Sequence, residues 1–218
     1  MSEVSPQFVG HVNLLGSSGP LHTGSFEAGE HNNLQSDRLY TAEANWVRET
    51  PAAREDLGGL EGAQDYLHSL VHNPKLDRIP GIHAVRGAIV KKDWVTIGHP
   101  IMDQYPEIFT NSASATGEAS GLPETGDLAG HSRIAFDKSA TQPFTYKGVT
   151  YPAFSPGGMN HEASHMFLHY TPDMQHAAHG WPMARTHLYI TKALLGESAA
   201  AHLTRHYNEN NVNYGGSL

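Results

Sequence analysis

The stretch from Gly157 to Tyr170 constrains this chain most, because it combines a helical pattern with the sequence H-E-x-x-H at residues 161–165. Residues four apart in a helix lie on one face, so His161 and His165 would present two imidazoles to a single ion. Glu162 points about 100° away from His161 and would hold a water molecule beside that ion. The motif therefore predicts a metal site on one face of a helix.

Several signals predict that this stretch is helical. The breaker cluster 155–158 precedes it, Asn160 is a suitable N-cap, and Thr171-Pro172 ends the pattern. Apolar side chains gather on one side and histidines on the other: Met159, Ala163, Met166, Phe167 and Tyr170 against His161, His165 and His169. The apolar side is expected to pack on a core, whereas the histidine side faces either a cleft or plain solvent. In a chain with 16 histidines the motif also arises by chance, and these histidines would then bind nothing.

A third metal ligand has to come from outside this helix. His161 and His169 are about 12 Å apart along a helix axis, so one ion cannot bind both. The pair is either His161 with His165 or His165 with His169, and the first is preferred because it brings Glu162 alongside. The residues that follow offer the candidates for the third ligand: His176, His179 and, behind them, His187.

At residues 161–165 the chain resembles the zincin metallopeptidases, which carry H-E-x-x-H on a helix. The resemblance implies that His161 and His165 bind zinc and that Glu162 is the general base. Leu168 and Thr171 stand where the longer metzincin motif has glycine and histidine, so the resemblance covers five residues and these three roles. In a hydrolase of this kind, Tyr170 or a spare histidine would donate a hydrogen bond to the developing oxyanion.

Two further histidine pairs have the same spacing of four residues. His68 and His72 lie away from the apolar stripe of their segment, which favours solvent over the core. His206, four residues after His202, is interpreted as a buried histidine that other side chains satisfy with hydrogen bonds.

Composition limits the chemistry and the partners. Cysteine is absent, so a metal must be held by His, Asp or Glu; zinc is the divalent metal that we expect, with copper or iron as alternatives. The net charge of −8 argues against a nucleic-acid partner. No segment approaches the ~20 apolar residues of a membrane span, and the N-terminus lacks signal-peptide features. We therefore expect a cytoplasmic or otherwise soluble protein that does not bind membranes.

The fold class that the pattern predicts is α+β, with β-hairpins in the middle of the chain packed against N-terminal and C-terminal helices and with long loops. The expected elements are helices over 37–47, 60–71 and 181–207, hairpins over 82–97 and 144–151, a strand over 133–136, and a long mobile loop or lid over 111–130. Residues 1–36 are interpreted as an extended arm, 37–207 as a single domain and 208–218 as a polar tail.

Three functions fit these features. The first is a metal-dependent hydrolase that acts on a small-molecule or peptide substrate through Glu162 and a histidine-bound ion. The second is an all-histidine copper or iron oxidoreductase. The third is a non-enzymatic component of a larger assembly, with the N-terminal arm joining copies into a homo-oligomer and histidines acting as pH-sensitive interface groups.

Overall fold

The structure is a computed structural model that describes residues 26–79, 81–88, 95–97, 117–120, 133–136, 141–146, 149–169 and 179–215. Its helices are α1 (Phe26–Glu49), α2 (Leu60–Val71), α3 (Ile82–Ala88), α6 (Pro156–His169) and α7 (Trp181–Glu209), with short 3-10 helices at Pro51–Arg54 and Pro74–Leu76. Its strands are β1 (Val95–Ile97), β2 (Gly117–Ser120), β3 (Arg133–Phe136), β4 (Phe144–Tyr146) and β5 (Val149–Tyr151).

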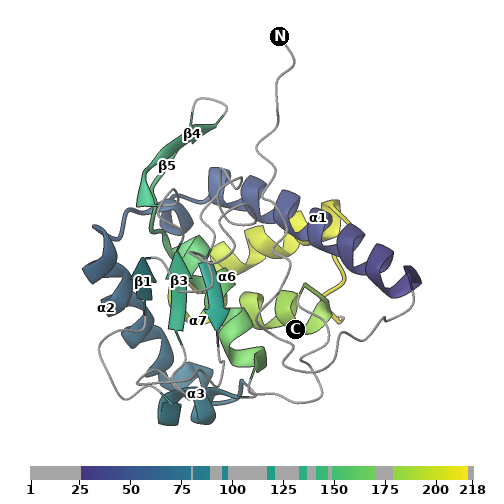
Figure 1. Ribbon diagram of the computed structural model, residues 1–218. Coiled ribbons are helices and arrows are strands. Elements are labelled where there is room, and N and C mark those ends of the chain that lie inside the picture. The colour runs from purple at the N-terminus through teal and green to yellow at the C-terminus, as the bar shows by residue number, and fades with distance from the viewer. Residues whose placement is uncertain are drawn as a thin grey trace.

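The described part of the chain is mostly helical, so the predicted α+β class is wrong. Helix α1 has 24 residues and α7 has 29, whereas each described strand has three or four. Strands β1, β3 and β2 form a small sheet in that order, with β1 parallel and β2 antiparallel to β3. Figure 1 shows this sheet beside α6, with α1 crossing above it and the β4–β5 hairpin projecting from the body.

The hairpin predicted over residues 82–97 is also wrong. Residues 82–88 form α3, and β1 pairs with β3 instead. Ile82 and Val85 are buried three residues apart, a spacing that gives a helix one apolar face. Arg86 secures the helix by donating to the Val71 carbonyl at 2.7 Å and pairing with Asp77 at 2.7 Å. The apolar composition of residues 82–88 suits a strand, but the two buried apolar residues are spaced as on one face of a helix.

Other expected elements are present. Helix α2 covers the predicted 60–71, β3 covers 133–136, and β4 pairs antiparallel with β5 as the hairpin over 144–151 requires. Strand β2 lies inside the segment expected to be a loop or lid, and the rest of 111–130 lies outside the described residues. Helix α1 begins at Phe26 and so includes residues that were assigned to the N-terminal arm.

Helix α6 lies between two apolar clusters. Met159, Ala163, Met166 and Phe167 pack with α2, α3 and the sheet, and Leu168 packs with α1 and α7. The apolar side of α6 therefore faces a core, as predicted. On the histidine side, His161 is buried and contacts Glu43 of α1.

The predicted N-cap of α6 is wrong. The helix begins at Pro156, and Asn160 lies buried inside it, where its Oδ1 accepts a hydrogen bond from Tyr66 at 2.8 Å. Helix α7 starts with Pro182 in its first turn, as expected, and is bent at Gly196, whose φ of 89° is not helical. None of the helices in the described residues is long and apolar enough to cross a membrane.

Candidate metal site

Three histidines bring their ligand atoms together between α6 and the start of α7. The candidate ligand atoms of His161, His165 and His179 all lie within 4.8 Å of one another. His161 and His165 are one turn apart on α6, and His179 stands two residues before Trp181, where α7 begins. The structure thus joins the motif pair to His179, one of the three candidates predicted for the third ligand.

The spacing of the two α6 histidines suits a shared ion. His161 Nε2 and His165 Nε2 are 3.2 Å apart. Two nitrogens bound to one tetrahedral zinc at 2.0–2.1 Å are separated by roughly 3.3 Å. The two nitrogens are therefore spaced as two ligands of one zinc ion would be.

Glu162 is the nearest acidic neighbour from α6. Its Oε1 lies 3.9 Å from His161 Nε2, and the residue is buried. A carboxylate at this distance is in reach of a water molecule bound to an ion between the histidines. The structure accordingly places Glu162 beside the three histidines, where the sequence motif expects it.

Glu43 of α1 forms a hydrogen bond with Nδ1 of His161, the ring nitrogen that does not face His165. The Glu43 carboxylate accepts from His161 Nδ1 at 2.7 Å through Oε2, and from His187 Nδ1 at 2.7 Å through Oε1. Tyr207 of α7 also donates to Oε1, at 3.1 Å. Because an ionised carboxylate only accepts, His161 Nδ1 must carry a proton, which leaves Nε2 of the neutral ring available to a metal.

Glu43, His161 and His187 also form a possible metal group by distance alone. Their separations of 2.7 Å are typical of charge-assisted hydrogen bonds, and three donors already occupy the two carboxylate oxygens. This second group is therefore a hydrogen-bonded support for His161, and the three-histidine group is the one that could hold an ion.

The buried charges of this network perturb each other. Burial raises the pKa of the Glu43 carboxyl, but the charges and hydrogen bonds of His161 and His187 outweigh burial and hold that pKa well below its ordinary value. Burial lowers the pKa of His161, whereas the Glu43 charge and hydrogen bond, with the Glu162 charge, raise it to about 9. The pKa of Tyr207 is raised by burial and by Glu43.

Tyr40 of α1 completes the surroundings of the three histidines. Its hydroxyl lies 2.7 Å from His179 Nε2, and its ring stacks on His161 with centroids 5.6 Å apart. The residue is buried. A phenol hydroxyl thus lies next to the point where the histidine nitrogens converge.

The other predicted site residues are placed as follows. His176 and Tyr170 lie outside the described residues, and His187 joins Glu43 instead of the three-histidine group. His68 and His72 are exposed, as expected. His206 is buried, as interpreted, but only its Nε2 has a hydrogen-bond partner, Glu49 Oε2 at 3.1 Å, whereas its Nδ1 has none among the described residues.

Sequence reasoning missed Tyr40, Glu43 and Tyr207. Tyr40 and Glu43 are three residues apart on the predicted helix over 37–47, so they share a face, and that face was a usable signal. Comparison with protein-family models, with curated proteins and with solved structures finds no match for this chain.

Proposed function

We propose that this protein is a metal-dependent hydrolase, in which His161, His165 and His179 hold a divalent ion and Glu162 is the general base. The observation that carries the proposal is the convergence of three histidine ligand atoms within 4.8 Å, with a buried carboxylate beside them. Three protein ligands with a fourth position for water or substrate are the arrangement of catalytic zinc sites. The zincin-like motif favours the same roles for His161, His165 and Glu162.

Each side chain has a distinct part in the proposed reaction. A zinc ion held by the three histidines would supply a Lewis acid that lowers the pKa of a bound water to about 7. Glu162 would accept the proton of the attacking water and would then pass it to the leaving group. Glu43 fixes the tautomer and the orientation of His161.

Tyr40 is placed to stabilise the charge that develops on the substrate. The Tyr40 hydroxyl lies 2.7 Å from His179 Nε2. With an ion held by the three histidines, this hydroxyl would be close enough to donate a hydrogen bond to the substrate oxygen on which negative charge develops. Among the described residues, this gives Tyr40 the role that the sequence assigned to Tyr170. The substrate class is a peptide or small molecule with a cleavable carbonyl group.

The proposal is tested by replacing the general base. Glu162→Gln keeps the shape of the side chain but cannot accept a proton, so turnover of a peptide and ester substrate panel should be abolished while zinc stays bound at the wild-type stoichiometry. Glu61→Gln on α2 changes an exposed carboxylate and serves as the matched control, with both activity and zinc retained. Unchanged turnover in Glu162→Gln would overturn the mechanism.

The metal itself separates this function from the alternatives. Zinc is proposed because three imidazoles without thiolates form a known zinc ligand set, although copper binds such nitrogen donors more tightly when both metals are present. Elemental analysis of protein purified without an affinity tag should find about one zinc per chain. A coloured protein containing copper or iron would favour redox chemistry, and a metal-free protein that assembles into large particles would favour a structural role.

A further inference from the structure

A pocket lies beside α1, away from the three histidines. Its described lining residues come from α1, from the start of α7 and from the C-terminal tail: Leu34, Gln35, Arg38, Gly180, Trp181, Asn211 and Asn213. Arg38 and Tyr40 are two residues apart on α1 and so point about 200° apart around the helix axis. The pocket is therefore distinct from the candidate metal site.

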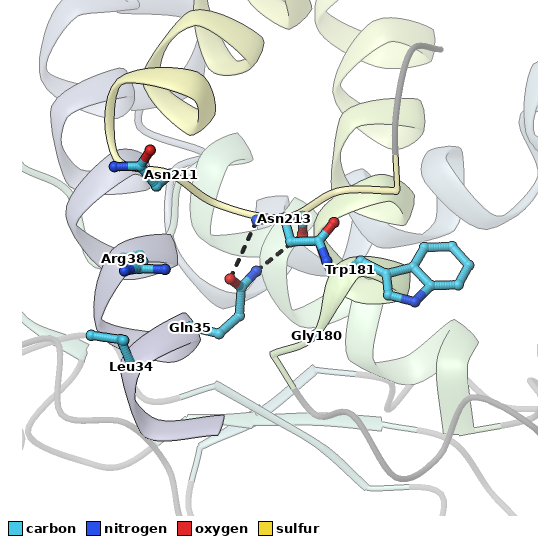
Figure 2. A pocket seen from close by; sticks show the side chains of 7 residues that line it. All are labelled: Leu34, Gln35, Arg38, Gly180, Trp181, Asn211 and Asn213. Atoms are coloured by element: carbon cyan, nitrogen blue, oxygen red, sulfur yellow. Dashed lines mark hydrogen bonds between the residues drawn. The ribbon is translucent and has the colours of Figure 1, made fainter. Parts of the chain in front are cut away.

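The pocket is large enough for a small molecule, and hydrogen bonds tie its tail side to α1. Its volume is about 340 Å³, within the range of small-ligand sites. The Gln35 side chain donates to the Asn213 carbonyl at 3.0 Å and accepts from the Asn213 amide at 3.3 Å, which ties the tail to α1 (Figure 2). Gly215 lies so close to Trp181 that an added Cβ would be 2.7 Å from the indole ring. The tail thus forms a stable wall.

Arg38 gives this pocket a positive charge that no described carboxylate neutralises. It is the only charged residue among the described lining residues, it is half-buried, and it forms no ion pair or hydrogen bond within the part of the chain that the structure describes. Arg86, Lys192 and Arg205, in contrast, each pair with a carboxylate. In a chain with 22 acidic and 14 basic residues, a half-buried guanidinium without a carboxylate is suited to a ligand that supplies one.

The same pocket exposes apolar surface. Leu34 is 49% exposed and Trp181 is 42% exposed, and they are two of the three large hydrophobic residues that are exposed in the described part of the chain. Figure 2 shows Leu34 and Trp181 on opposite sides of Gln35, so exposed apolar side chains border the pocket on two sides, which indicates a binding surface. A ligand for this pocket should therefore combine an anionic group with an apolar group.

We propose that this pocket binds an organic carboxylate, with the carboxylate on the Arg38 guanidinium and the apolar portion against Trp181 and Leu34. The planar guanidinium fork matches two carboxylate oxygens, and an indole face accepts an aliphatic or aromatic group. A free organic acid and the C-terminus of a peptide present the same chemistry. This site does not depend on the proposed hydrolase activity.

The test titrates the full chain with hexanoate, N-acetylleucine and a short peptide ending in leucine, and follows heat and the indole N–H signals of the three tryptophans. Trp181→Phe identifies the signal that should move. Binding of hexanoate and N-acetylleucine is expected, with hexanamide, which lacks the charge, weaker by on the order of 10- to 100-fold. If the peptide binds markedly more tightly than the two acids, the natural ligand is a chain terminus. If the peptide binds no more tightly than hexanoate and N-acetylleucine, the natural ligand is a free acid.

Arg38→Gln should weaken the binding of hexanoate by a similar factor of about 10 to 100. Arg54→Gln is the matched control, because Arg54 is also half-buried without an ion pair in the described residues but lies on the 3-10 helix Pro51–Arg54. The proposal is overturned if hexanoate does not shift the Trp181 signal, if hexanamide binds equally well, if inorganic phosphate binds as tightly as hexanoate, or if Arg38→Gln binds like the wild type. Zinc affinity should be unchanged in Arg38→Gln, so failure here leaves the metal site unaffected.

Discussion

Glu43 accepts hydrogen bonds from three buried donors, and through one of them it sets the protonation of a proposed metal ligand. Glu43→Gln replaces one acceptor oxygen by an amide that can only donate, so one histidine N–H or the Tyr207 hydroxyl is left facing a donor. Supporting carboxylates of this kind typically contribute 10- to 100-fold to metal affinity. We expect zinc to bind Glu43→Gln about 10- to 100-fold more weakly, measured by competition with a chromophoric chelator.

Glu49→Gln is the control for this prediction. Glu49 is also an α1 carboxylate that contacts a buried histidine, in its case His206 at 3.1 Å, but it is not part of the three-histidine group. Its zinc affinity should match the wild type. Equal losses in both variants would mean that Glu43 acts through general stability and has no specific effect on His161.

Zinc binding should release a proton from His161. In the metal-free protein the pKa of His161 is raised to about 9, because the Glu43 charge and hydrogen bond, with the Glu162 charge, outweigh burial, which lowers it. The ring is therefore cationic near neutral pH, and zinc needs the Nε2 lone pair. Calorimetry at about pH 7.5 in buffers of different ionisation enthalpy should detect about one proton released from this residue per zinc.

The raised pKa of His161 determines the pH range in which zinc binding releases its proton. Proton release from His161 should disappear as the pH rises through about 9, because the free ring is then already neutral. Glu43→Gln removes the main charge that raises the pKa, so its proton release near neutral pH should be smaller. Proton release that does not change between neutral and strongly alkaline pH would contradict the role of His161.

At the level of single residues, the H-E-x-x-H motif could be predicted from the sequence, but the carboxylate that hydrogen-bonds His161 could not. His161, Glu162 and His165 are consecutive in a known pattern, and His179 is near them in the chain. Glu43 is separated from His161 by 118 positions in the sequence, and a glutamate on an amphipathic helix is ordinarily solvent-exposed. Only the packing of α1 on α6 and α7 turns Glu43 into a buried acceptor.

The start of α6 has to approach α1 closely, and Gly157 makes this approach possible. A Cβ at Gly157 would lie 2.8 Å from Val47 Cγ2 and 2.9 Å from the Ala53 carbonyl oxygen. The carbonyl belongs to the backbone and cannot move away easily. Gly157→Ala should therefore destabilise the protein by about 1–3 kcal/mol in chemical denaturation.

Gly158→Ala is the matched control for this helix contact. A Cβ at Gly158 meets only Ser155 Oγ at 3.5 Å, an ordinary contact distance. Alanine is the better helix former, so this variant should be neutral or up to about 1 kcal/mol more stable. If Gly157→Ala and Gly158→Ala behave alike, the close packing of α6 on α1 does not limit stability.

The elements show why the fold class was mispredicted. Helix α2 was predictable because Leu67, Leu70 and Val71 repeat at helical spacing without competing signals. Residues 82–88 contain β-branched side chains that favour strands, and their helical conformation depends on tertiary contacts such as Arg86 with Val71 and Asp77. Such contacts join residues that a local pattern does not compare.

For the whole molecule, the proposed ion would connect segments that are distant in the chain. His161 and His165 lie on α6, His179 precedes α7, and Glu43 reaches His161 from α1. An ion bound only by the folded protein stabilises it by RT ln(1 + [L]/Kd), about 4 kcal/mol at a thousandfold excess over Kd. For a chain of 218 residues this corresponds to a rise in Tm on the order of 10 °C.

Calorimetric melting with zinc and with a chelator measures this stabilisation. The rise in Tm should be lost in His165→Ala, because the three-histidine group is then broken. A double variant, His68→Ala with His72→Ala, is the control, since these histidines have the same spacing of four residues but are exposed on α2. It should keep the full rise, because two exposed imidazoles on one helix lack the third ligand and the buried carboxylates that the α6 pair has. If zinc still raises the Tm of His165→Ala but not that of the double variant, zinc binds at α2 and the arrangement between α1, α6 and α7 is not the metal site.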